Sequence, residues 1–136
     1  MYDLPALIGW VALGSAGGGV ARFFVSGVVA RRVGETFPWG TMVVNVSGAC
    51  ALGGFAAWAP GELPAAWAPA WPLVAVGFLG SYTTVSSFSI QTLALVRAGE
   101  WGRAGSNVLL TLLLCLAGVS AGFALAGALL NGSAAQ

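Results

Sequence analysis

Apolar residues fill this chain in four long stretches that short polar connections separate. The stretches cover about residues 4–30, 39–58, 71–96 and 104–130. Each approaches or exceeds the roughly 20 residues that a helix needs to cross a hydrocarbon core. Trp39 and Trp58 bound the second stretch, as aromatic residues do at both membrane interfaces. The pattern predicts an all-α membrane protein in which residues 1–136 form a single domain of four transmembrane helices.

The composition supports lipid as the solvent, because 58% of the 136 residues are apolar and only 7% are charged. Five arginines against four acidic residues leave a net charge of +1, which is too little to bind a nucleic acid backbone. The chain has no histidine, and Cys50 and Cys115 lack the spacing of a zinc site or a disulfide framework. We therefore expect no enzyme and no nucleic-acid partner.

Four of the five arginines lie in the first and third connections, at residues 31, 32, 97 and 103. Short loops rich in arginine stay in the cytoplasm, so this placement predicts that both termini lie outside. Given the four crossings, we expect a multi-pass protein of the cell inner membrane or of the plasma membrane. A chain that inserts in both orientations would carry a more even distribution of arginines.

The third apolar stretch is crowded with polar groups, since eight of the twelve residues from Ser81 to Thr92 carry hydroxyls. Such groups cost several kcal/mol each when they face lipid, so we expect this segment to face protein or water. Gly77 and Gly80, followed by β-branched residues, favour a break near mid-membrane. Broken helices expose backbone groups that can hold ions. The alternative is that the hydroxyls bond to the preceding turn and only pack helices.

The other stretches contribute isolated polar residues, each with two interpretations. Asn45 carries amide donors that suit an anion, or that join two helices. Asn107, Thr111 and Cys115 share one helix face, which is either a weakly polar track or a packing stripe. Arg22 either raises the local anion concentration at a pore mouth or extends to the interface.

No Asp or Glu lies within a predicted span, so a proton relay or a cation site built on carboxylates is disfavoured. The lining is neutral and rich in donors, which favours a small anion or a neutral solute over a cation. Phe78 and Phe88 either add electropositive ring edges to this lining or serve only as packing residues.

Three motifs in order along the chain resemble the Fluc (CrcB) family of small fluoride channels. They are GSAGGGVARF at 14–23, FPWGTMVVNVSG at 37–48 and GFLGSYTTVSSFSIQ at 77–91. The resemblance implies that subunits of four helices, the third of them broken, pair as antiparallel, dual-topology dimers. It further implies two fluoride pathways, a structural sodium ion at the dimer interface, and passive export of fluoride that entered as the neutral acid and ionised inside.

The resemblance also implies a role for particular residues of this chain. The backbone carbonyls of Gly80 and Thr83 would hold the sodium ion, and Arg22 would lie near a vestibule. The fluoride pathway would include Asn45, Val85, Ser86, Ser87, Phe88, Thr111 and Cys115. Fluoride, membrane lipid and a second subunit are thus the partners that we expect.

Two positions depart from the family pattern. Val85 stands where the family has the first of two phenylalanines, so it supplies no ring edge, and Gln91 stands where the family has an acidic residue. Together with the one-sided arginines, these departures lead to the hypothesis that this subunit has a fixed orientation and pairs with an oppositely inserted homologue. One pathway would then be degenerate. A small multidrug-type exporter is a further alternative, although such exporters of cations use a membrane carboxylate.

Overall fold

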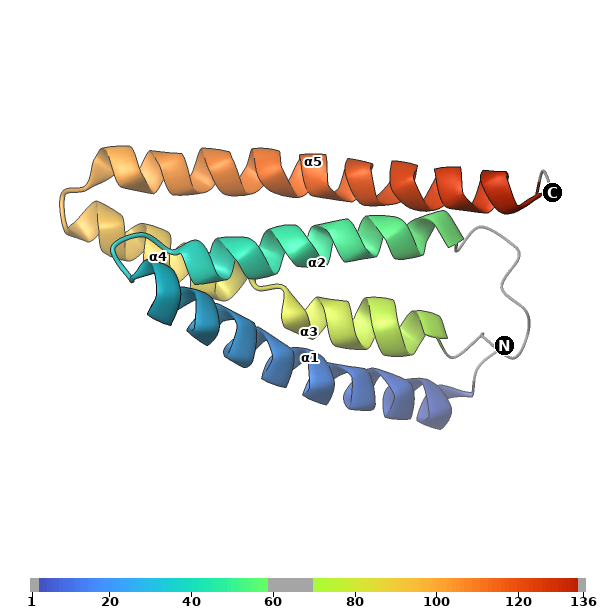
Figure 1. Ribbon diagram of the computed structural model, residues 1–136. Helices are drawn as coiled ribbons and strands as arrows, with labels where there is room; N and C mark the ends of the chain where they lie inside the picture. Colours follow the sequence, from blue (N-terminus) through green and yellow to red (C-terminus); the bar gives the residue numbers. More distant parts are fainter. Residues whose placement is uncertain (1–2, 59–69, 135–136) are drawn as a thin grey trace.

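The computed structural model describes residues 3–58 and 70–134, and the regular structure in these ranges is helical. The elements are α1 (Leu4–Val33), α2 (Trp39–Trp58), η2 (Trp71–Leu79), α3 (Gly80–Tyr82), α4 (Val85–Arg97) and α5 (Trp101–Ala134). Figure 1 shows η2, α3 and α4 following one another as one interrupted crossing. With this crossing counted as one, the described residues form four helical segments long and apolar enough to span a membrane, as predicted. Most of the predicted second connection lies outside the described residues.

The helices extend further than the hydropathy pattern predicts at their polar ends. The α1 helix starts after Asp3, whose side chain accepts a hydrogen bond from the Ala6 amide at 2.8 Å, and it continues to Val33. The predicted end was residue 30, but Arg31 and Arg32 lie in the last turn, where positive charge stabilises the helix dipole. Gly34 ends the helix with a φ of 92°, a conformation that favours glycine.

The third crossing is broken where the sequence predicts it. Thr83 and Thr84 are both extended, with ψ angles of 158° and 122°, between the end of α3 and the start of α4. Before the break, η2 is wound as a π-helix over Trp71–Leu79. The crossing therefore has two helical halves joined by two extended residues, and backbone groups at the junction lack the partners of a continuous helix.

Glycines let the helices pack with their backbones in contact. Gly14 and Gly18 of α1 are buried, and a Cβ on Gly18 would overlap the Phe78 carbonyl of η2. A Cβ on Gly53 of α2 or on Gly122 of α5 would likewise overlap the facing backbone. These contacts form two close pairs, α1 with η2 and α2 with α5, of the kind that small residues allow in membranes.

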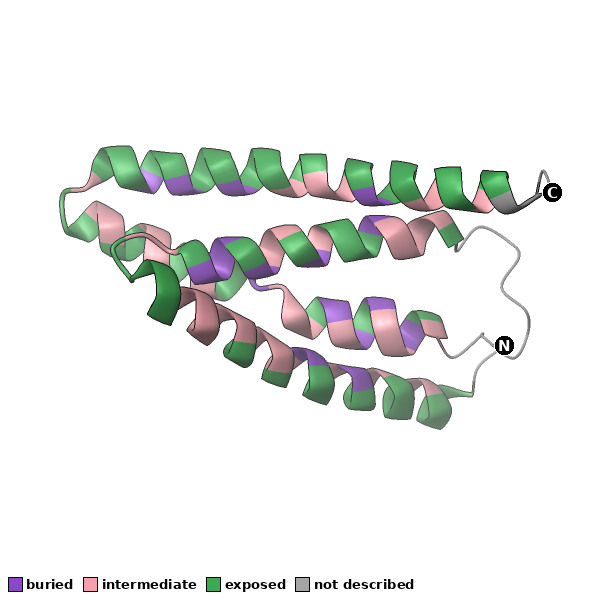
Figure 2. Ribbon diagram, viewed as in Figure 1, coloured by how far each residue is buried: buried purple, intermediate pink, exposed green. Residues whose placement is uncertain are grey.

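Burial is concentrated where the helices meet, and most of the outer surface is apolar and exposed, as expected for contact with lipid (Figure 2). The buried apolar residues are Met42, Val44, Ala75, Leu79 and Ala104. Four polar residues are also buried, namely Thr41, Thr84, Asn107 and Thr111. By contrast, no residue of α4 is buried. The polar interior thus lies around the break and along the inner faces of α2 and α5.

Candidate functional site

The break in the third crossing is held by Asn45 of α2. The Thr84 amide donates to Asn45 Oδ1 at 2.7 Å, and Asn45 Nδ2 donates to the Thr84 carbonyl at 3.0 Å. The amide therefore satisfies both backbone groups of the extended residue, which would otherwise be unpaired inside the membrane. Joining two helices is thus one role of Asn45. Its second Nδ2 hydrogen remains for another acceptor, and contact with an anion stays a prediction.

Two carbonyls near the break lack the donors that a continuous helix would give them. In a continuous helix the Thr84 amide would donate to the Gly80 carbonyl, but it donates to Asn45 instead. The Ser87 amide would donate to the Thr83 carbonyl, but it donates to Thr84 Oγ1 at 3.2 Å. Gly80 and Thr83 both line the groove described below. The two residues whose carbonyls lose their helical donors therefore border one space.

Several hydroxyls around the break bond locally. Thr84 Oγ1 caps the start of α4 and lies 3.1 Å from Ser86 Oγ and 3.3 Å from Ser87 Oγ. Thr83 Oγ1 donates to the Leu79 carbonyl at 2.9 Å, within its own crossing. Tyr82 and Ser47 join the crossing to α2 through their hydroxyls, which are 2.9 Å apart. Packing and capping thus account for part of the hydroxyl-rich segment, as the alternative interpretation held.

An open groove of about 630 Å³ lies between the break, α2, α4 and α5. It brings together seven of the residues predicted for the site: Asn45, Gly80, Thr83, Val85, Phe88, Thr111 and Cys115. Ser86 and Ser87 do not line it, because only every third or fourth residue of a helix shares a face, and Val85 and Phe88 occupy that face of α4. Val85 lies at the margin of the groove with 76% of its surface exposed.

The groove also contains residues that the sequence analysis did not single out. They are Gly48, Ala49, Leu52, Ala75, Leu79, Thr84, Val108 and Leu112. Helical spacing was the available signal, since Gly48 and Ala49 follow Asn45 by three and four residues, and Val108 precedes Thr111 by three. The walls between the polar groups are therefore apolar or small.

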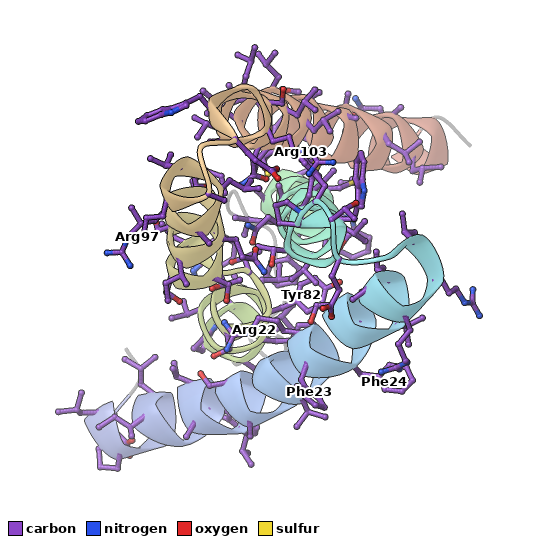
Figure 3. All side chains as sticks on the ribbon, turned by 90° about the vertical axis from the view of Figure 1, so that its left-hand side faces the viewer. Arg22, Phe23, Phe24, Tyr82, Arg97 and Arg103 are labelled. Atoms are coloured by element: carbon purple, nitrogen blue, oxygen red, sulfur yellow. The ribbon has the colours of Figure 1, made fainter. Side chains whose placement is uncertain are left out.

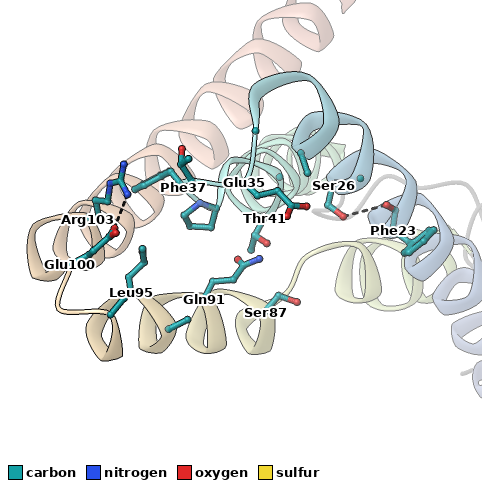
Figure 4. Close-up of a pocket in the computed structure, with 18 residues that line it drawn as sticks. Phe23, Ser26, Glu35, Phe37, Thr41, Ser87, Gln91, Leu95, Glu100 and Arg103 are labelled. Carbon is teal, nitrogen blue, oxygen red and sulfur yellow. Dashed lines mark hydrogen bonds and ion pairs between the residues drawn. The ribbon is translucent and has the colours of Figure 1, made fainter.

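Arg22 lies apart from the groove, in a pocket of about 250 Å³ that Thr41, Thr84 and Ser87 also line. Figure 3 shows Arg22 toward the third crossing, whereas Arg97 points away from the bundle. The pocket shares Phe23, Ser26, Thr41 and Ser87 with a larger cavity of about 750 Å³ at the end of the bundle where α1 ends and α5 begins. We call this larger cavity the vestibule (Figure 4).

Charged residues of both signs lie in this region: Glu35, Glu100 and Arg103 line the vestibule, and Arg22 lines the adjoining pocket. In the vestibule, Arg103 Nη1 lies 2.7 Å from Glu100 Oε2, so these two charges largely cancel. That pair is the salt bridge found in residues 3–58 and 70–134, which leaves Arg22 without a carboxylate partner among them. An unpaired cation beside a polar pocket raises the local concentration of anions. Gln91 also lines the vestibule. Its Oε1 atom is buried and has no hydrogen-bond partner among the described residues.

The sequence matches the family described as CrcB-like protein, Camphor Resistance (CrcB), over residues 9–123. A protein of Rhodopseudomonas palustris (strain BisB18) named fluoride-specific ion channel FluC 2 is 58% identical over 118 residues, covering 86% of this chain and 90% of that protein. One of the same name from Bradyrhizobium diazoefficiens is 56% identical over 121 residues, covering 88% of both chains. Brucella suis has a fluoride-specific ion channel FluC 3 that is 49% identical over 115 residues, covering 83% of this chain and 86% of that protein. With its four membrane-spanning helices and this match over most of its length, the chain belongs to the CrcB family of multi-pass bacterial membrane proteins.

Proposed function

We propose that this chain is a subunit of a fluoride-selective channel through which fluoride leaves the cytoplasm passively. The observation that carries the proposal is the groove at the helix break, which is lined by Asn45, Gly80, Thr83, Phe88 and Thr111 and by no carboxylate. The relatives named fluoride-specific ion channels support the choice of ion. A channel of this kind carries out no reaction and needs no energy source besides the fluoride gradient.

The lining explains how a strongly hydrated anion can enter a membrane. Fluoride must exchange its water for donors of similar strength, and hydroxyl and amide hydrogens along the path supply them. Thr111 and Cys115 lie at i and i+4 on α5, so their groups follow one another along the groove. The ring of Phe88 adds an electropositive edge. Arg22 near the vestibule concentrates the anion before it reaches these groups.

A second subunit would cover the open side of the groove. Several residues of α4 are exposed in this chain, among them Val85, Ser86, Ser89 and Ile90 in its first half. Serine hydroxyls in the middle of a crossing are costly against lipid, whereas a facing subunit can pair them. An antiparallel dimer, in which each subunit presents its break to the other, satisfies this requirement.

The freed carbonyls suit a sodium ion at such an interface. Unwound backbone carbonyls coordinate sodium in other broken membrane helices, and the oxygens of Gly80 and Thr83 belong to this class. Both residues lose their helical donors to Asn45 and Thr84, as described above. The chemistry of this donor set therefore fits the ion, which would hold the two breaks together by charge.

One observation favours pairing with a different chain. Arg31, Arg32, Arg97 and Arg103 all lie in the terminal turns of helices at one end of the described bundle, which favours a single orientation in the membrane. In that case the antiparallel partner would be an oppositely inserted homologue. Reporter fusions at the C-terminus test this hypothesis: a single location supports it, and an even split between the two sides of the membrane contradicts it.

A flux assay tests the channel function itself. Liposomes containing the purified chain, alone and together with an oppositely oriented homologue, are loaded with fluoride or with chloride, and efflux is followed with ion-selective electrodes. We expect rapid loss of fluoride and none of chloride. Fluoride efflux equal to that of empty liposomes under both conditions would refute the proposal. Proton-coupled movement of a quaternary ammonium cation would instead support a multidrug-type exporter.

A further inference from the structure

A chain of hydrogen bonds joins α5 to α4 behind the groove. Thr111 Oγ1 donates to Asn107 Oδ1 at 3.5 Å, and Asn107 Nδ2 donates to Thr92 Oγ1 at 2.9 Å. Thr92 Oγ1 in turn donates to the Phe88 carbonyl at 2.7 Å. The donors thus all point the same way, from α5 toward the backbone of α4.

The residues at the two ends of this series of hydrogen bonds line the groove, and the residues in its middle do not. Thr111 of α5 and Phe88 of α4 both line the groove, whereas Asn107 and Thr92 are absent from its lining. Asn107 is only 1% exposed. An ion in the groove therefore meets the residues at the ends of the chain but cannot touch the pair in the middle.

Both functional atoms of the Asn107 amide are used within the protein. Its oxygen accepts from Thr111, and its nitrogen donates to Thr92. Because the bond to Thr92 crosses between helices, it fixes how far α5 is rotated and how near it lies to α4. The bond from Thr111 directs the single hydrogen of that hydroxyl to Asn107 and leaves its lone pairs free, and polar chains of this kind are coupled in a medium of low dielectric.

From this geometry we infer that Asn107 and Thr92 are positioning residues of the pathway. The pair sets the separation between Phe88 on α4 and Thr111 on α5, so it controls how fast an ion passes these two residues. This inference rests on the proposed channel function and adds to it a pair of residues that act only through others. In this inference Asn107 holds Thr111 in place and does not itself contact the ion.

The matched pair of variants at position 92 separates a hydroxyl effect from a shape effect. Thr92→Val keeps the size and branching of the side chain but loses both of its hydrogen bonds, whereas Thr92→Ser keeps the hydroxyl. Asn107→Leu removes the bond from the other side. Ser120→Ala serves as the control on α5, because the Ser120 hydroxyl bonds only the Leu116 carbonyl of its own helix among the described residues.

The first measurement is the fluoride current of single channels in planar bilayers, using the chain alone or with its homologue, whichever conducts. The second is the fraction of liposomes that contain an active channel. A role in folding alone would lower the number of active channels and leave the current of each unchanged. We expect Thr92→Val and Asn107→Leu to lower the single-channel current about fivefold, as the loss of one inter-helix hydrogen bond allows. Thr92→Ser and Ser120→Ala should keep the current near the unmodified value. The double variant Thr92→Val/Asn107→Leu should lose no more current than either single variant.

The inference is overturned if Thr92→Val conducts like the unmodified chain, if Thr92→Ser is as impaired as Thr92→Val, or if only the number of active channels falls. In each of these cases the unmodified protein still conducts fluoride and the proposed function stands. Absence of any fluoride current from the unmodified protein refutes the proposed function, and the inference with it.

Discussion

The two halves of the third crossing are held in place in different ways. In η2, Pro72, Ala75, Gly77 and Leu79 are buried, and this half lies against α1 with backbones in contact. The second half, α4, has no buried residue. Its described links to the other helices include two polar ones, from Asn45 to Thr84 and from Asn107 to Thr92.

The difference shows how one crossing can combine an anchor with an ion-facing surface. Close packing of glycine against backbone is steric, so it tolerates no added atom and exposes no polar group. Hydrogen bonds from single side chains are directional and few, so they leave the rest of a helix surface uncovered. In this chain the uncovered surface of α4 borders the groove and is free to meet a second subunit. Substitutions should therefore affect the two halves in different ways and by different amounts.

The largest effect is expected where the first half meets α1. Gly18→Ala should lower the free energy of unfolding by about 3 kcal/mol, because the new Cβ would overlap the Phe78 carbonyl and the backbones would have to separate. Gly9→Ala is the control on the same helix, since nothing lies within 4 Å of a Cβ there. Unfolding in detergent, followed by circular dichroism, measures both changes.

The control should be neutral or more stable by up to about 1 kcal/mol, because alanine favours the helix over glycine. Equal stability of the Gly18 and Gly9 variants would show that the first half is not anchored by close contact, and the comparison between the two halves would fail.

This anchor shows how much of the fold the sequence could predict. Apolar length alone predicted the four crossings, and two threonines after two glycines predicted the break. The helix that packs against each helix was not predictable. Gly18, for example, contacts a carbonyl some sixty positions away, and the sequence around Gly18 does not specify that contact. The π-helical winding of η2 has no signal in the sequence that we can identify.

The next effect concerns the junction between the halves. Asn45→Leu should lower the free energy of unfolding by about 2 kcal/mol, because the Thr84 amide and carbonyl would lose their hydrogen bonds to the Asn45 side chain. It should also abolish fluoride efflux, since the Gly80 carbonyl then regains its helical donor as the break closes. Unfolding in detergent and liposome efflux are measured on the same preparation.

A restored helix is directly observable in this variant. Hydrogen exchange at the Thr84 amide should change, because its acceptor is then a carbonyl of its own helix. Unchanged exchange together with unchanged efflux would mean that Asn45 does not maintain the break.

A smaller effect is expected at the start of the second half. Thr84→Val should cost about 1 kcal/mol, because the valine cannot accept the hydrogen bond from the Ser87 amide that caps α4. Thr84→Ser keeps the capping oxygen and should be nearly as stable as the unmodified chain. The same unfolding assay decides, and a serine variant as unstable as the valine variant would show that the methyl group matters more than the cap.

The sequence indicated which residues lie together but not how they bond. The family resemblance pointed to residues 45, 80, 83, 85, 88, 111 and 115, and these line one groove in the structure, while their roles toward ions stay predictions. Asn45 uses both its amide oxygen and its amide nitrogen to bond Thr84. This pairing depends on the register between α2 and the break, which no local sequence pattern specifies. Ser86 and Ser87 were predicted with the others because they are adjacent in sequence, although helical geometry turns them to other faces of α4.

The smallest effect should come from a polar contact that belongs to the anchored half. Ser47 and Tyr82 pair their hydroxyls across α2 and α3 at 2.9 Å, on a surface that is exposed at Ser47. Because glycine contacts already fix this half, Ser47→Ala should lower the free energy of unfolding by only about 0.5 kcal/mol and leave fluoride efflux unchanged. Tyr82→Phe removes the same bond from the other side and should match it in the unfolding assay. If either variant costs as much as Asn45→Leu, polar contacts support both halves equally, and close packing is not what distinguishes the first half from the second.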